Sequence, residues 1–66
     1  MDGTANRLID LAAKLLILSR KCADDGAEDK SLEYSNMYHG VLMAIETSTS
    51  LTEYRATCII SDMIKR

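Results

Sequence analysis

The 66-residue chain contains no proline, no tryptophan and no phenylalanine, and it has only three glycines and two cysteines. Proline interrupts helices most strongly, so its absence leaves Ala, Leu, Lys, Glu and Met free to form long helices. Two cysteines are too few for the disulfide framework of a small secreted domain. We therefore expect an all-α fold in which Cys22 and Cys58 are reduced.

Long hydrophobic runs are also missing. The longest apolar run covers residues 15–18, and charged Lys14 and Arg20 lie close on either side of it. A membrane-spanning helix needs about 18 or more apolar residues, so we expect no contact with a membrane. Asp2 stands where a secretory signal peptide carries basic residues. The sequence thus predicts a cytoplasmic protein.

The charge balance gives little support to nucleic-acid binding. Eight Lys and Arg residues stand against ten Asp and Glu residues, for a formal net charge of −2. The basic residues are scattered, and only residues 20–21 and 65–66 form adjacent pairs. Binding to phosphates requires clustered bases, so we do not expect nucleic acid as a partner.

Catalytic and metal-binding patterns fail as well. His39, the single histidine, has no carboxylate three or four residues away, and both cysteines occupy apolar positions of the pattern. If Gly26 is aligned with the glycine of a calcium-binding EF-hand loop, Lys21, Ala23 and Leu32 fall on ligand positions. We therefore expect no enzyme, no bound metal and no cofactor.

The first strong pattern is an amphipathic helix over about residues 4–23. Its apolar arc covers roughly half of the circumference, wider than the stripe of an ordinary surface helix, so we expect contacts from two sides. Ile17 lies alone on the polar arc. The residues of the apolar arc are Leu8, Ile9, Leu11, Ala12, Leu15, Leu16, Leu18 and Cys22.

An acidic loop over residues 24–30 is expected to end this helix. Gly26 is suited to the left-handed conformation of a helix C-terminus, and Ser31 is a plausible N-cap for the next helix. The loop is expected to be either a solvated connection or an acidic knob that docks into a basic groove of a partner. Its carboxylates are Asp24, Asp25, Glu28 and Asp29.

A second helical limb is expected over about residues 31–65. Its core face comprises Tyr34, Met37, Tyr38, Val41, Ala44 and Ile45. Residues 47–50 are poor helix formers, and the spacing of Ser50 and Glu53 matches a capping box that would start a third helix. The hydrophobic phase nevertheless continues through this segment. The sequence therefore predicts either a helical hairpin with one long, bent second limb or a small three-helix bundle.

Several apolar side chains remain once each helix has been given one core face. Leu32 and Met43 share the back of the second limb with His39, and Ile17 stands apart on the first helix. We interpret Ile17, Leu32, His39, Met43 and the acidic loop as contacts to a partner protein. A further stripe, which we assign to a dimer interface, comprises Leu51, Tyr54 and Cys58.

A chain of 66 residues forms one domain, residues 1–66, that buries only about 60% of its unfolded surface. We therefore expect a homodimer. The favoured function is non-enzymatic: binding another protein to modulate or inhibit it, as phage or mobile-element inhibitors of host machinery do. Two alternatives stay open, a small DNA-binding transcriptional regulator and a protein that sequesters a small nucleotide at an oligomer interface.

Overall fold

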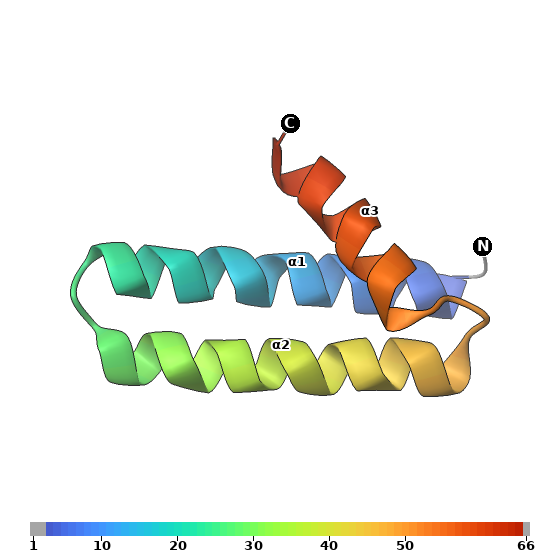
Figure 1. The fold of residues 1–66 in the computed structure, drawn as a ribbon, viewed down its shortest axis with the longest axis horizontal. Coiled ribbons are helices and arrows are strands. Elements are labelled where there is room, and N and C mark those ends of the chain that lie inside the picture. Colours follow the sequence, from blue (N-terminus) through green and yellow to red (C-terminus); the bar gives the residue numbers. More distant parts are fainter. Residues whose placement is uncertain (1–2, 66) are drawn as a thin grey trace.

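The computed structural model describes residues 3–65, and these residues form three helices without strands (Figure 1). Helix α1 spans Gly3–Asp24, α2 spans Glu28–Ser48 and α3 spans Glu53–Lys65. The expected all-α fold is confirmed. Of the two architectures that the sequence allowed, the three-helix one is present, and the single long helix over residues 31–65 is wrong.

A tight turn joins α1 to α2. Gly26 has φ +82°, a left-handed conformation that glycine adopts without the steric cost of a Cβ. Its N–H donates to the carbonyl of Ala23, and the N–H of Ala27 donates to the carbonyl of Cys22, the pattern of a Schellman C-cap. The glycine thus ends α1 as expected, but the turn covers only residues 25–27.

The second helix begins three residues earlier than expected. It starts at Glu28, and Ala27 before it makes no side-chain capping bond. Glu28 and Asp29 are therefore part of the first turn of α2, where their negative charge interacts favourably with the helix dipole. The prediction of Ser31 as N-cap was wrong because these two carboxylates stabilise an earlier start.

Ser31 instead links α2 to α1. The Ser31 hydroxyl donates to the carbonyl of Ser19 over 2.9 Å, and the Ser19 hydroxyl donates to the carbonyl of Ser31 over the same distance. Because this reciprocal pair gives the buried Ser19 hydroxyl a hydrogen-bond partner, the fold avoids the free-energy cost of burying an unpaired hydroxyl.

Hydroxyl groups also explain why α2 stops. The side chains of Ser48 and Thr49 donate to the carbonyls of Ala44 and Ile45, and Thr49 is extended. The Thr52 hydroxyl then accepts from the N–H of Arg55, so Thr52 is the N-cap of α3. The capping box predicted for Ser50 and Glu53 is replaced by this bond two residues further along.

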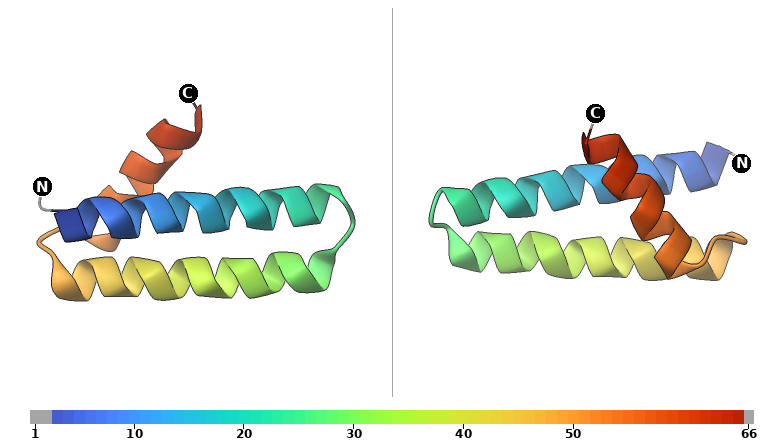
Figure 2. Two further views of the ribbon diagram at one scale, coloured as in Figure 1. Left: turned by 180° about the vertical axis from the view of Figure 1, so that it is seen from behind. Right: turned by 45° about the horizontal axis from the view of Figure 1, so that its top comes forward.

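The core lies where the three helices meet. Its buried members are Ile9, Ala12, Ala13, Leu15, Tyr38, Leu42, Ile45, Ala56 and Ile60. Helices α1 and α2 form an antiparallel hairpin, and α3 crosses one face of it and extends past α1 (Figures 1 and 2). The molecule measures 36 × 24 × 18 Å.

Candidate functional site

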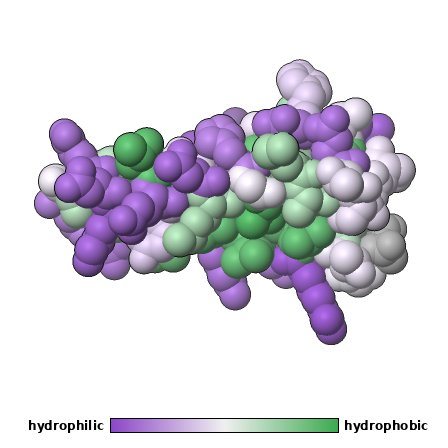
Figure 3. Space-filling view, turned by 90° about the horizontal axis from the view of Figure 1, so that it is seen from below, coloured by the Kyte–Doolittle hydropathy of each residue, from purple (hydrophilic) through white to green (hydrophobic). Residues whose placement is uncertain are grey.

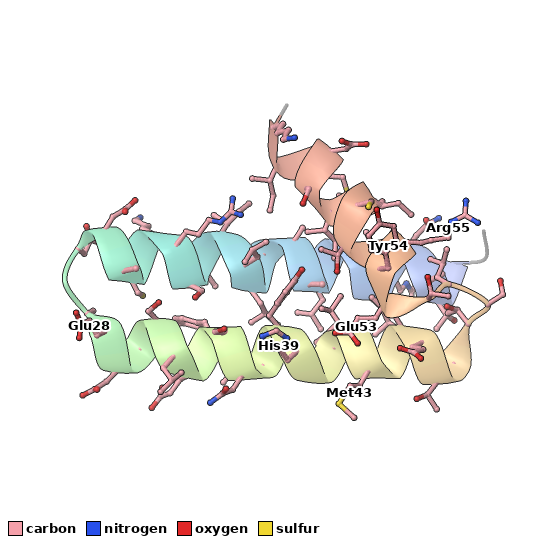
Figure 4. All side chains as sticks on the ribbon, in the orientation of Figure 1. Glu28, His39, Met43, Glu53, Tyr54 and Arg55 are labelled. Atoms are coloured by element: carbon pink, nitrogen blue, oxygen red, sulfur yellow. The ribbon has the colours of Figure 1, made fainter. Side chains whose placement is uncertain are left out.

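The outer side of α2 presents an exposed apolar stripe. Leu32 is 63% exposed and Met43 is 66% exposed, and His39 between them is exposed too. The ends of this stripe are eleven residues apart, about 16 Å along the helix. Figure 4 shows Met43 pointing away from α1. We call Leu32, His39 and Met43 the α2 stripe.

His39 is held against the helix surface by its neighbour. The ring centroids of His39 and Tyr38 are 5.6 Å apart with an interplanar angle of 59°. Tyr38 is buried in the core, so its ring offers a fixed edge for the imidazole. The α2 stripe therefore combines two flexible apolar side chains with one better-oriented polar ring.

The stripe ends at a hollow between the C-terminal part of α2 and the start of α3. Met43, Glu46, Thr47 and Glu53 line it. Glu46 and Glu53 place two carboxylates beside the Met43 thioether, so this end of the surface is apolar and acidic together. No pattern in the sequence indicated that Glu46 and Glu53 would line one hollow, because their approach depends on the turn between α2 and α3.

The acidic turn lies at the opposite end of the stripe. Asp24 ends α1, Asp25 lies in the turn, and Glu28 and Asp29 open α2; all four are exposed. Glu28 precedes Leu32 by four residues, a spacing that makes side chains neighbours on a helix. The turn therefore extends the α2 stripe into an acidic region.

Ile17 is exposed as expected, at 49%, but it lies on α1, a different helix from the stripe. The structure also separates the three residues assigned to a dimer interface. Leu51 is half-buried and packs against the core, whereas Tyr54 and Cys58 are exposed on α3. Leu51 is therefore used inside the monomer.

Four apolar residues expected on the core faces are instead exposed: Leu11, Leu18, Met37 and Ala44. The sequence carried a sign of this, since the apolar arc of the first helix is wide enough for two neighbours. Because α2 packs against only part of that arc, Leu11 and Leu18 on the rest of it are exposed to solvent.

The described residues offer no cluster of metal-ligating side chains. Within residues 3–65, no three His, Cys, Asp or Glu side chains lie close enough together to hold a metal ion. Cys22 and Cys58 are both free thiols. In the same part of the chain, none of the helices has the length and apolar character that crossing a bilayer requires.

Comparison of the chain with protein-family models, with curated proteins and with solved structures finds no match.

Proposed function

We propose that this chain is a non-enzymatic protein that binds another protein through the α2 stripe and modulates its activity. The observation that carries the proposal is the exposure of Leu32 and Met43 on one line along α2. Full burial of such a side chain contributes about 1.5–3 kcal/mol of favourable free energy relative to full exposure. A partner that covers Leu32 and Met43 therefore binds more tightly. Methionine suits this role because its flexible side chain adapts to different partner surfaces.

The charges beside the stripe indicate the chemistry of that partner. Glu46 and Glu53 flank Met43, and the acidic turn lies beyond Leu32. A helix or groove with apolar residues at its centre and Lys or Arg at both ends would match this arrangement. The carboxylates would mainly accelerate association, and added salt would weaken that effect.

We also propose that the chain acts as a homodimer. The three-helix monomer leaves Leu11, Leu18 and Met37 exposed in addition to the α2 stripe. A second copy is the simplest partner to cover them, and the dimer would leave the α2 stripe available for the other protein.

The protein-binding function can be tested by capture from a lysate of the source cells with immobilised chain. We expect Met43→Asp to abolish capture while its circular dichroism spectrum stays helical, since Met43 is exposed and makes no core contact. Met63→Asp, the same substitution at an exposed methionine of α3, is the matched control and should retain capture. Equal capture by wild type and Met43→Asp would contradict the proposal.

A further inference from the structure

One broad face of the α1–α2 hairpin has no third helix on it. Helix α3 crosses the face turned to the reader in Figure 1, and the view from behind in Figure 2 shows α1 and α2 with α3 beyond them. We call this uncovered side the bare face. Its exposed members are Leu11 and Leu18 of α1 and Met37 of α2. Leu8 and Val41 are half-buried on the same side, and Leu15, also on this side, belongs to the core.

Helical geometry assigns these residues to one side. Each of them comes one position before a residue that faces the other helix, as Met37 precedes Tyr38 and Leu11 precedes Ala12. Moving back by one residue turns the direction of a side chain by about 100° around the helix axis. In two antiparallel right-handed helices that pack against each other, this turn leads to the same side of the pair on both helices.

The same geometry places the bare face away from α3. Met37 precedes Glu46 by nine residues, about two and a half helical turns, so the two point in opposite directions. Glu46 lines a hollow together with Glu53 at the start of α3. Met37 therefore faces the side that α3 leaves open.

Helix α1 carries two parallel seams with alternating spacings of three and four. The inner seam packs on α2 and consists mainly of small residues: Ala5, Ile9, Ala12, Leu16 and Ser19. The outer seam belongs to the bare face and has the spacing of a coiled coil: Leu8, Leu11, Leu15, Leu18 and Cys22. Four of the five leucines of α1 thus lie on the outer seam, which the monomer covers only in part.

The exposed area on this face is large for so small a protein. Leu11 is 45%, Leu18 40% and Met37 53% exposed. The chain exposes 4720 Å² in all, whereas a compact monomer of 7.3 kDa would expose about 4,200 Å². This excess is spread over the whole molecule, and Leu11, Leu18 and Met37 of the bare face contribute to it. It amounts to more than half of the roughly 800 Å² that each partner buries in a stable complex. Figure 3, seen from the α2 side, shows hydrophobic side chains gathered over the middle of the molecule.

We propose that a second copy of this chain covers the bare face, with α1 of each copy lying over α2 of the other. The result is a four-helix bundle around a two-fold axis parallel to the helices, and it rests on the homodimer proposed above. The outer seam of α1 carries no charge between Leu8 and Cys22. Lys30 of α2, which precedes Ser31, lies at the end of this face near the turn and is exposed, so its ammonium group can stay in water while the apolar middle of the face is covered.

Charge at the edges favours this arrangement over its alternative. The outer edge of α1 carries Arg7, Lys14 and Lys21 at seven-residue spacing, and the outer edge of α2 carries Asp29 and Glu33. The bonds between Ser19 and Ser31 place these two residues at the same height along the hairpin. With α1 over α2 of the second copy, Lys21 therefore lies beside Asp29. Glu33 lies between the heights of Lys14 and Lys21, while Arg7 lies beyond these two acids. With α1 over α1, the basic residues of the two copies would face each other and repel.

The test is the absolute mass in solution, measured by light scattering on a sizing column at micromolar concentration. Wild type should have twice the monomer mass of 7.3 kDa. Leu18→Asp should fall to the monomer mass, and so should Met37→Glu on the other helix. Both variants should keep a helical circular dichroism spectrum. If Leu18→Asp fails to fold, Met37→Glu still tests the interface.

Two neighbouring variants serve as controls. Ile17→Asp changes an equally exposed residue next to Leu18 but away from the bare face, and it should remain dimeric. Tyr54→Asp should also remain dimeric. A monomeric wild type would overturn both the dimer and the bare face. If Leu18→Asp and Met37→Glu fold and remain dimeric, the dimer exists but the bare face is not its interface. The same conclusion would follow if Tyr54→Asp alone gave a monomer. Capture by the α2 stripe is read separately from mass, with Met43→Asp.

Discussion

At the scale of single residues, side-chain size on the inner seam of α1 sets how closely the first two helices approach. Ala12 has no exposed surface, and it shares this seam with Ala5 and the hydrogen-bonded Ser19. Small residues at seven-residue spacing let two helix backbones lie near each other, which brings Ile9 and Leu42 into the same core. Four of the five leucines of α1 lie on the outer seam, and Leu16 alone lies on the inner one.

A larger side chain at Ala12 should therefore destabilise the fold. We expect Ala12→Leu to cost about 1–3 kcal/mol of unfolding free energy, because the added atoms force the helices apart. Denaturant titration followed by circular dichroism measures this. Ala23→Leu, at an exposed position of the same helix, should change stability by less than about 0.5 kcal/mol. Similar costs for both substitutions would show that the inner seam is not tightly packed.

At the scale of elements, the sequence predicted the existence of the helices better than their ends. The periodicity of α1 and the role of Gly26 were predicted correctly. The start of α2 and the break after Ser48 were not decided by pattern alone. Both depend on local competition among hydroxyls and carboxylates, and the cap that forms at Thr52 replaces the Ser50–Glu53 box that the sequence predicted.

Mutation distinguishes the observed cap of α3 at Thr52 from the capping box predicted at Ser50. Because the Thr52 hydroxyl accepts from the N–H of Arg55 over 3.2 Å, we expect Thr52→Ala to cost about 1 kcal/mol. Ser50→Ala should change stability by less than about 0.5 kcal/mol, since exposed Ser50 caps nothing. Thermal or urea unfolding of the two variants provides the comparison. A larger loss in Ser50→Ala would restore the capping box as the true start of α3.

The candidate site was likewise predictable from the sequence only in part. Exposure of Leu32, His39 and Met43 was predictable, because each lies opposite the core face of a regular helix. The acidic hollow and the bare face were not, since they arise from where α3 crosses the hairpin. Periodicity identifies the faces of a helix, but it does not say which neighbour takes each face.

At the scale of the whole molecule, the three helices are unequally anchored. Helices α1 and α2 pack along their full length, while the 13-residue α3 buries only Ala56 and Ile60 completely. A segment with few buried contacts opens at a lower free energy than the rest of the fold. The hairpin is thus the more stable unit, and α3 is held by buried Ala56 and Ile60 together with half-buried Ile59 and Ile64.

Hydrogen exchange should reveal this difference. We expect the backbone amides of α3 to exchange faster than those in the middle of α1 and α2 when followed by NMR in D2O. Ile60→Ala should widen the difference, because it removes the largest buried contact of α3. Uniform protection across all three helices would show that the chain opens only as a whole.

The position of α3 on one face of the hairpin also determines valency. If two copies join through the bare face, their α2 stripes remain uncovered and lie on opposite flanks of the bundle. Such a dimer would offer two identical binding surfaces fixed at one separation. A target that is itself a symmetric oligomer, or that repeats its binding segment, would be held by both surfaces at once, with an avidity that can exceed the affinity of one surface by about 100-fold or more.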